Sequence, residues 1–441
     1  MNDGRTRPRV TDRRRNSLPR ALAAFEQRDF RLLFLSAMTS GIGDQLQTVS
    51  NLWQIYALTG SAIHLGLTGV ARAAPIILFS LLGGVIADRF DRRTIIVLAQ
   101  VGVGLAALAL AVLSATGLVE VWHIYVVTSM GASLTSLSAP ARRALISTVV
   151  PRHQLMNAMA LNMSVNQLDR MIAPAIAGLL IVFVGLPVTY AGNGIAHILT
   201  AAAIGFIAVR RTQAPPAESP LRSLLDGLAF VRRRTVILAL LATDVAAMLF
   251  GSYQVILPIF ADGFGVGAVG YGLLQSAPAV GSLVGAAVIL GLGDSRYKGY
   301  LIVGSILGYC VCLAGLAAAP WFSLALLAGA GLGFTNSMQA TPRNAVIQLV
   351  TPDELRGRVT SFQQMLTGGG PGLGQGIMGA AAAMLGPLAL VAGGIACAAV
   401  NIGILVARKE LRAPDLGAAP EVTPVGIADR AGRPTLVGRF G

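Results

Sequence analysis

Long apolar runs alternate with short polar connections along almost the whole chain. A window of about 19 residues, the length needed to cross a bilayer, finds twelve such runs. Each run is predicted to be a transmembrane helix, because lipid offers the backbone no hydrogen-bond partners. The first six runs lie near Leu32–Leu58, Ile63–Ala87, Thr94–Ala115, Val121–Leu145, Leu155–Val184 and Val188–Val209. The second six lie near Thr235–Phe260, Gly270–Leu292, Tyr300–Ala318, Trp321–Ala345, Leu355–Met384 and Pro387–Ala407.

The composition excludes a soluble protein. Of the 441 residues, 54% are hydrophobic and only 12% are charged, whereas about one quarter of an ordinary soluble protein is charged. The same figures exclude a disordered chain, a coiled coil, collagen and a small disulfide scaffold. The three cysteines all fall inside apolar runs, so neither a disulfide framework nor a metal site is expected. The predicted fold class is therefore an all-α membrane protein.

Basic residues mark one side of the membrane. Of the 34 lysines and arginines, 32 lie in the two tails and in alternate connections, and the other two are Arg72 and Arg170. Basic residues accumulate on the cytoplasmic side of membrane proteins, so both termini are predicted to be cytoplasmic. Topology thus explains the net charge of +14, and no nucleic-acid partner is expected. The first tail is rich in arginine but also holds acids, which argues against an organelle transit peptide.

The chain is predicted to divide into two similar halves. After the fourth and the tenth runs the sequence repeats a Pro…Ala-x-Ile…Pro frame, over Pro140–Pro151 and Pro342–Pro352. Both copies face the same side, which indicates parallel repeats with a binding site between them at the membrane midplane. The predicted parts are an Arg-rich cytosolic tail (1–31), a six-helix bundle (32–209), a cytosolic connection with an amphipathic helix (210–234), a second six-helix bundle (235–408) and a cytosolic tail (409–441).

One connection carries a family signature. Between the second and third runs the chain reads Gly84-Val-Ile-Ala-Asp88-Arg89-Phe90-Asp91-Arg92-Arg93. This resembles the G-x-x-x-D-R-x-G-R-R signature of the major facilitator superfamily, with Asp91 where the wider signature has Gly. The resemblance implies 12 transmembrane helices in two six-helix, parallel-repeat bundles, and secondary active transport by rocker-switch alternating access. It also implies that Asp88 helps to close the cytoplasmic side by contacting the start of the eleventh helix.

A second motif narrows the resemblance. The eleventh helix is preceded by Thr351-Pro352-Asp353-Glu354, a predicted capping box, and the string continues Leu355-Arg356-Gly357-Arg358-Val359. With Gly43-Asp44-Gln45 in the first run, this is similar to the exporter branch that contains the enterobactin exporter and macrolide-efflux-type proteins. The similarity covers about residues 28 to 408 and implies proton-coupled export of a siderophore or a drug-like amphiphile. It makes Arg356 or Arg358 the expected partner of Asp88.

The sequence departs from one antiporter motif. Ala173-Pro174 stands in the fifth run where many drug/proton antiporters have Gly-Pro. That motif alone therefore does not support antiport.

Five ionisable residues remain at membrane depth: Asp44, Arg72, Asp169, Arg170 and Asp244. Each costs about 2.5–3.5 kcal/mol at a helix centre, so such residues normally face a water-filled cavity or one another. Three acids stand against two bases, which leaves one acid as a candidate proton carrier. In the superfamily, helices 1, 4, 7 and 10 line the cavity, so Asp44 and Asp244 are the preferred sites. The expected pairs are Arg170 with Asp44 or Asp169 with Arg72; fixed ion pairs that only hold helices together are the alternative.

Other residues complete the predicted cavity and its moving parts. Polar side chains on the first, fifth, seventh and eleventh helices are Gln45, Gln47, Asn162, Asn166, Gln167, Tyr253, Gln254, Gln363 and Gln364. His197 is interpreted as a packing histidine. Glycines from Gly368 to Gly376, interrupted by Pro371, predict a bend in the eleventh helix, and Gly281 with Gly285 predicts a packing face on the eighth.

Other functions fit less well. No lysine lies in a G-K-[ST] context, so no P-loop is encoded. Gly41-Ile-Gly43-Asp44 matches the G-x-G-D of intramembrane aspartyl proteases, but no tyrosine is followed by the aspartate that such enzymes pair with it. A receptor and a solute uptake permease stay open as alternatives. We expect a monomeric transporter of the bacterial cytoplasmic membrane, in contact with lipid and a small-molecule substrate, that is no enzyme and needs no cofactor.

Overall fold

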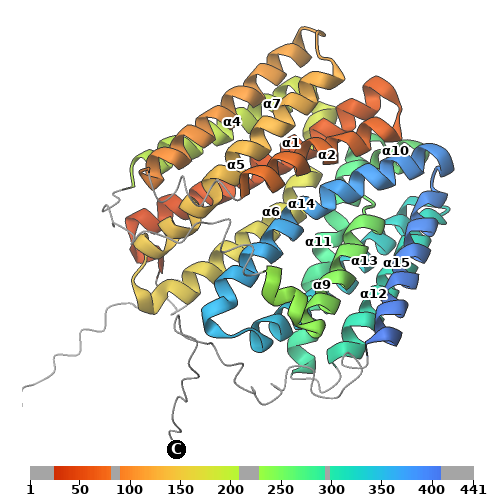
Figure 1. Cartoon of the computed structure of the whole chain (residues 1–441). Coiled ribbons are helices and arrows are strands. Elements are labelled where there is room, and N and C mark those ends of the chain that lie inside the picture. Colours follow the sequence, from red (N-terminus) through yellow and green to blue (C-terminus); the bar gives the residue numbers. More distant parts are fainter. Residues whose placement is uncertain (1–23, 81–89, 208–227, 294–297, 409–441) are drawn as a thin grey trace, which may run out of the picture.

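The computed structural model describes residues 24–80, 90–207, 228–293 and 298–408, and in these ranges the regular structure is entirely helical (Figure 1). The helices of the first half are α1 (Arg28–Thr59), α2 (Ala62–Ser80), α4 (Arg92–Ala115), α5 (Val121–Val149), α6 (Leu155–Phe183) and α7 (Gly185–Gly205). Those of the second half are α9 (Thr235–Phe250), α10 (Leu257–Gly263), α11 (Gly267–Leu292), α12 (Lys298–Ala317), α13 (Phe322–Val350), α14 (Asp353–Leu385) and α15 (Leu388–Ala407). Each of the twelve apolar runs overlaps at least one of these helices, so the helical character of the described parts of the runs is confirmed.

The seventh run is broken, and its prediction as one continuous helix was wrong. α9 ends at Phe250, with Gly251 as its C-cap, and α10 begins at Leu257 with Pro258 in its first turn. Glycine is common just after the end of a helix. Proline has no backbone N–H to donate, so it fits the first turn of a helix and not its interior. The break puts Tyr253 and Ser252 in non-helical backbone between the two halves of the molecule.

Two other boundaries differ from the prediction. α1 begins at Arg28, inside the segment interpreted as a cytosolic tail, because Phe25, Phe30 and Phe34 pack together there with ring centroids 4.8–6.2 Å apart. At the start of α14 the N-cap is Pro352 and not Thr351 as the predicted capping box requires, and the hydroxyl of buried Thr351 donates back to the carbonyl of Ile347. The predicted central amphipathic helix lies largely outside the described residues.

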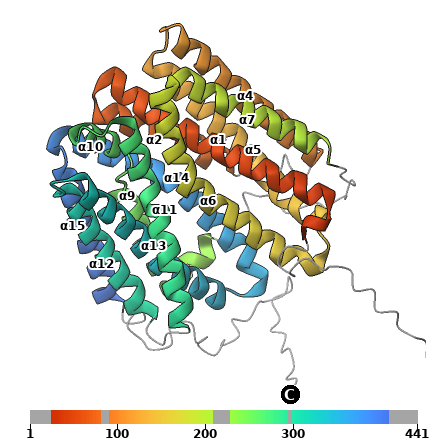
Figure 2. The ribbon, with the colours of Figure 1, turned by 180° about the vertical axis from the view of Figure 1, so that it is seen from behind.

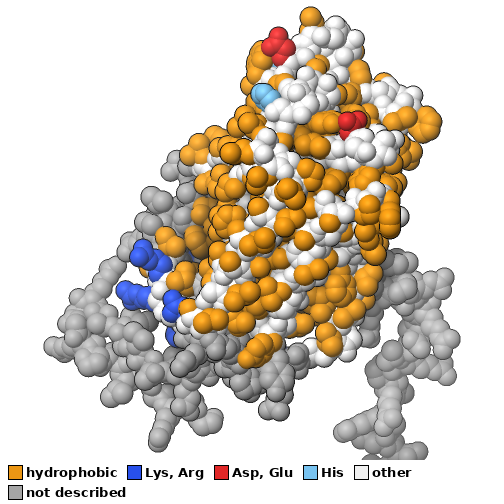
Figure 3. All heavy atoms as spheres, turned by 90° about the vertical axis from the view of Figure 1, so that its right-hand side faces the viewer, with side chains coloured by type: hydrophobic (Ala, Val, Ile, Leu, Met, Phe, Trp, Pro, Cys, Tyr) orange, Lys and Arg blue, Asp and Glu red, His pale blue; other side chains and the backbone are white. Residues whose placement is uncertain are grey.

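The surface has the pattern of a membrane protein. Figure 3 shows apolar side chains over the middle of one face, with basic residues gathered near one end and acidic residues with a histidine near the other. Six of the described helices, α2, α4, α6, α11, α12 and α15, are long and apolar enough to cross a membrane. Others such as α1 and α7 are long enough but more polar, because they carry Asp44, Asn193 and His197.

Two long helix pairs join the halves. α2 lies along α14 and α6 lies along α11, as Figures 1 and 2 show from opposite sides. Glycines allow the first pair to approach closely: a Cβ on Gly66 would lie 2.8 Å from the carbonyl oxygen of Gln375 and 2.9 Å from the Cα of Gly379. In the second pair, Gly272 packs against the backbone of Pro174 and Gly178. The predicted packing face on α11 is also confirmed, since Gly281 and Gly285 lie against the backbone of α13.

The hydrophobic core is shared between the halves at only one end. There the second half of α1 and the start of α2 pack in one buried cluster with α10, the start of α11 and the end of α14. At the other end, where Arg28, Arg92 and Arg234 lie, the buried clusters of the described residues belong to one half each. We call these the α10 end and the arginine-rich end. The halves are therefore packed together at the α10 end and packed separately at the arginine-rich end.

Candidate transport site

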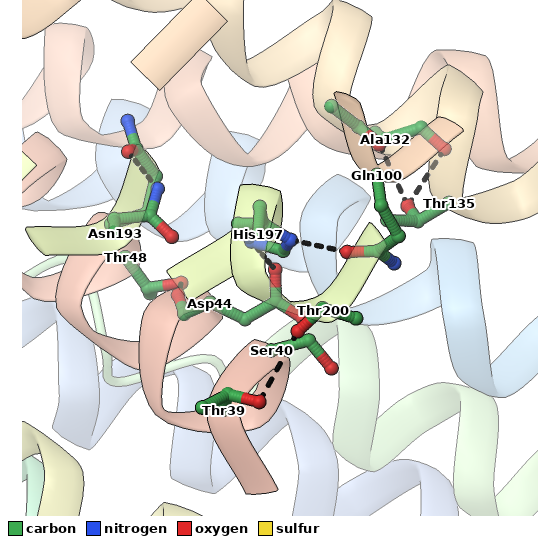
Figure 4. Close-up of polar contacts among 12 residues, drawn as sticks. Thr39, Ser40, Asp44, Thr48, Gln100, Ala132, Thr135, Asn193, His197 and Thr200 are labelled. Carbon is green, nitrogen blue, oxygen red and sulfur yellow. Dashed lines mark hydrogen bonds and ion pairs between the residues drawn. The ribbon is translucent and has the colours of Figure 1, made fainter. Parts of the chain in front are cut away.

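A carboxylate and an imidazole meet in the middle of the first half. Asp44 Oδ1 of α1 lies 3.4 Å from His197 Nε2 of α7, and His197 Nδ1 lies 2.6 Å from Gln100 Oε1 of α4 (Figure 4). The Asp44 side chain is 56% exposed, whereas that of His197 is 1% exposed. Asp44 is thus open to exchange protons with water while its partner is enclosed. The burial of His197 and its bond to Gln100 fit the interpretation as a packing histidine. The sequence did not predict that the packing of α1 against α7 would also bring His197 close to Asp44.

The other polar residues of α1 hold helices together. Asn193 of α7 donates a 2.6 Å hydrogen bond to Gln47, which donates to Asn51 at 2.8 Å, and Asn51 donates to Thr128 of α5 at 3.0 Å. This chain crosses three helices, and buried amide bonds of this kind orient the helices that they join. Gln47 was predicted as a cavity residue, and its side chain instead hydrogen-bonds between helices. Gln45 is half-buried on the same helix.

Two arginines lie near Asp44, and a third lies near one of them. Arg72 of α2 and Arg142 of α5 both interact electrostatically with the charge of Asp44, and Arg72 also with that of Arg170 of α6. Arg142 donates a 3.2 Å hydrogen bond to Ser40. The predicted contact of Arg170 with Asp44 does not form, since Asp44 pairs with His197 instead. Sequence reasoning missed Arg142, which it assigned to a cytoplasmic connection although the residue lies within α5.

Asp169 is buried against α1. Its side chain presses on α1 where Gly41 leaves room for it, and its Oδ2 forms no hydrogen bond within the described ranges. The predicted pair of Asp169 with Arg72 is therefore wrong.

Asp244 forms an ion pair that the sequence did not suggest. Arg343 of α13 donates to Asp244 of α9 and, at 3.0 Å, to Gln339 one turn earlier on its own helix. Asp244 and Arg343 are 6% and 3% exposed. The sequence interpretation put Arg343 in a cytoplasmic connection, which was wrong, because a buried carboxylate on the facing helix stabilises the guanidinium within the bundle. With Arg142 and Arg343 inside the helices, the count of three acids against two bases does not hold.

The expected gate is only partly within the described residues. Gly84, Asp88 and Arg89 lie outside them, so the predicted contact of Asp88 is not seen. Asp91 caps α4 by accepting bonds from the backbone and hydroxyl of Thr94, at 3.0 and 2.9 Å. Arg93 donates to the carbonyl of Gly205, and Arg92 is half-buried beside it.

The other residues of the expected gate lie at the start of α14. Arg356 binds Asp353 on its own helix at 2.7 Å and the carbonyl of Gln348 at 3.3 Å. Arg358, two residues further along α14, is half-buried. At this end Arg143 of α5 donates to Gln364 of α14, which joins the two halves.

The remaining predicted cavity residues form hydrogen bonds of different kinds, some within one half and one between the halves. Gln167 of α6 donates to the carbonyl of Ala279 on α11 at 2.9 Å and so bonds across the halves. Exposed Asn166 bonds the carbonyl of Asn162 on its own helix. Gln363 donates to Asn344 of α13 at 2.6 Å. Within the described ranges, no cluster of His, Cys, Asp and Glu is arranged to hold a metal ion.

A contact at the α10 end was not foreseen. The hydroxyl of Tyr56 on α1 donates a 2.8 Å hydrogen bond to Asp262 of α10, and Trp53 stacks on Tyr271 of α11 with ring centroids 5.9 Å apart. Both contacts join the first half to the second. The only signal in the sequence was the presence of aromatic residues near helix ends, which is common at membrane interfaces.

Comparison with known proteins shows what this arrangement is similar to. Residues 20–424 match the family described as transmembrane secretion effector. The enterobactin exporter EntS of Shigella boydii serotype 18 is 26% identical over 384 residues, covering 87% of this chain and 92% of the relative. The enterobactin exporter of Escherichia coli O81 is 25% identical over the same coverage.

Solved transporter structures share the fold. A peptide transporter of the POT family in complex with alafosfalin superposes with a TM-score of 0.70 at 11% identity, covering 91% of this chain and 100% of that one. A bacterial homologue of the human lysosomal transporter Spinster, described as inward-facing and unoccupied, gives 0.65 at 15% identity, covering 89% and 96%. At these identities the likeness concerns the fold alone.

Proposed function

We propose that this chain, which belongs to the transmembrane secretion effector family of the major facilitator superfamily, is a proton-coupled exporter of a small molecule. The family is one of membrane transporters, so the chain is a multi-pass transporter of the bacterial inner membrane and not an enzyme. The cargo that we propose is a siderophore or a drug-like amphiphile, because relatives that match over 87% of the chain are enterobactin exporters. Uptake of a solute by the same fold is the alternative.

The proposed architecture has twelve membrane spans in two six-helix bundles, residues 32–209 and 235–408, with both termini in the cytoplasm. The positions of the basic residues support this orientation, and parallel repeats support a site between the bundles. We propose that the chain works as a monomer within lipid, with its tails and its central connection in the cytosol.

The proposed transport cycle is a rocking of the two bundles. Separate cores at the arginine-rich end and a shared core at the α10 end support a state that faces the cytoplasm. The pairs α2–α14 and α6–α11 run along the boundary of the halves and can serve as the axis. To face outward, the protein has to separate Tyr56 from Asp262 and Trp53 from Tyr271, and to close the rest of the arginine-rich end around the existing α5–α14 contact.

The observation that carries the proposed proton coupling is the contact of Asp44 with His197. The carboxylate of Asp44 is exposed and can take up a proton from the cavity, and it loses its attraction to the groups around it when it does so. Gln100 fixes the ring through Nδ1, so Nε2 points at the carboxylate. Protonation of Asp44 therefore weakens its attraction to His197, Arg72 and Arg142 together, which links proton uptake to the packing of four helices.

Transport into inside-out vesicles tests this function. With an acidic lumen, wild-type protein is expected to accumulate enterobactin or an amphipathic drug in the lumen. Asp44→Asn should abolish accumulation driven by the pH gradient. It should still exchange labelled for unlabelled cargo when the cargo concentration is equal inside and outside the vesicles. His197→Gln should weaken the coupling of cargo transport to the pH gradient. Asp29→Asn, at the start of the same helix, is the matched control. Normal gradient-driven accumulation by Asp44→Asn would reject the assigned proton site.

A further inference from the structure

We infer that the transported molecule carries an anionic oxygen group, such as a carboxylate, and that the guanidinium groups of Arg72, Arg142 and Arg170 bind it. This inference deepens the proposed transport function and rests on it. The three arginines come from α2, α5 and α6, and all of them belong to the first half. We call them the arginine cluster.

The first argument is the lack of protein partners. Arg72 and Arg170 lie near the middle of their helices, and neither forms a hydrogen bond or an ion pair of its own within the described part of the chain. Arg142 has a single hydroxyl partner, Ser40. A guanidinium at membrane depth is costly unless it is solvated or paired with an anion. Each guanidinium has five N–H donors, and most of these donors therefore have no acceptor in the described part of the protein.

The second argument is that the cluster faces the boundary between the halves. The charge of Arg72 interacts with those of Asp44 and Arg170, and that of Arg142 with Asp44. Arg170 also interacts with Tyr253, which lies in the break between α9 and α10 of the other half. Arg72 and Arg170 are both exposed. Groups from four helices and from both halves are thus close to one another in this region.

The third argument is the balance of charge. The two nearby carboxylates form no ion pair with these arginines in the described residues. Asp44 contacts His197, and Asp169 is buried against Gly41. Three guanidiniums against two carboxylates leave an excess of positive charge on this face. Arg343 in the second half shows the contrast, because it is 3% exposed and bonded to both Asp244 and Gln339. The cluster is therefore available to a ligand and Arg343 is not.

The chemistry of arginine selects the ligand class. A guanidinium presents a planar fork of donors that matches the two oxygens of a carboxylate, and such charge-assisted pairs are stronger than neutral hydrogen bonds. An anion bound here would also compete with Asp44 for Arg72 and Arg142. The strength of anion binding is therefore expected to depend on whether Asp44 is charged.

Binding to the purified protein tests the inference without any gradient. The probes are dansylaminoundecanoic acid and its methyl ester, which differ only in the charge of the carboxyl group, measured by fluorescence with protein in phosphatidylcholine nanodiscs. Wild-type protein is expected to bind the acid at least about tenfold more tightly than the ester, the effect of one charge-assisted bond. Arg72→Gln and Arg170→Gln should each remove most of this preference, and Arg170→Lys should keep part of it. Arg232→Gln, at an exposed site outside the bundle, is the matched control.

The outcomes separate this inference from the proposed function. Equal binding of acid and ester by wild-type protein, or an unchanged preference in both glutamine variants, overturns it. Displacement of the acid by a low fraction of phosphatidylglycerol would make a lipid headgroup the occupant and overturns the assignment to cargo. A preference for the acid that depends on the cluster supports the inference even if gradient-driven transport fails, and that failure would count against proton coupling alone.

Discussion

Arg343 of α13 donates a hydrogen bond to Asp244 of α9, and both side chains are almost completely buried in the second half. Removing one partner of a buried ion pair costs about 3–5 kcal/mol, because the other charge is left unpaired. We therefore expect Asp244→Asn and Arg343→Met to lower the free energy of unfolding by this amount. Unfolding in detergent micelles, followed by circular dichroism, measures the loss.

The double variant of this pair provides the control. Asp244→Asn with Arg343→Met leaves no uncompensated charge, so it is expected to be more stable than either single variant. Additive losses in the double variant would mean that the two residues act independently.

Tyr56 and Asp262 join the halves at the α10 end by a 2.8 Å hydrogen bond. Tyr56→Phe removes this bond, worth about 1 kcal/mol, and should shift the equilibrium about fivefold toward the state that is open at this end. Spin labels at Leu58 and Gly263, both exposed there, report the separation as a distance distribution in a cysteine-free background.

Tyr125→Phe is the matched control for that experiment. Its hydroxyl donates a 3.0 Å bond to the carbonyl of His64 within the first half, so its loss should leave the separation unchanged. Equal shifts in both variants would indicate a general loosening rather than a latch between Tyr56 and Asp262.

Gly66 sets the distance between α2 and α14. A Cβ at this position would lie 2.8 Å from a carbonyl oxygen and 2.9 Å from the Cα of Gly379, so the two helices would have to separate. We expect Gly66→Ala to destabilise the protein by about 1–3 kcal/mol, the usual effect of overpacking, as a lower thermal unfolding midpoint. Gly131→Ala on α5, which has open space around it, should be neutral or stabilising. The same midpoint for both variants would contradict the close crossing.

Asp169 is buried against Gly41 with no hydrogen bond to its Oδ2 in the described residues. A neutral amide of the same shape is less costly to bury than a carboxylate. Asp169→Asn is therefore expected to raise the unfolding midpoint, by about 1 kcal/mol or more of stability, opposite in sign to Asp244→Asn. A lower midpoint would show that the carboxylate has a stabilising partner.

Much of the site could be predicted as a set of residues but not as a set of contacts. The sequence indicated Asp44, Arg72, Asp169, Arg170 and Asp244 because charges within apolar runs are rare. The partners that it suggested for Asp44 and Asp169 were wrong, and His197, Arg142 and Arg343 were missed. From the sequence alone, an arginine near the end of an apolar run cannot be told from one in a cytoplasmic connection. The distinction depends on whether the facing helix offers it a partner.

The sequence by itself determined the helical runs and, through two short motifs, the superfamily. Both signals are local, because hydropathy is summed over one helix and each motif is contiguous in the chain. Only the tertiary structure decided which carboxylate meets which base. That choice depends on how each helix is rotated and on which helices are neighbours, and these follow from packing such as that of Gly66 on α14 and of Gly41 on α6. Asp44 faces His197 and Asp244 faces Arg343 for this reason.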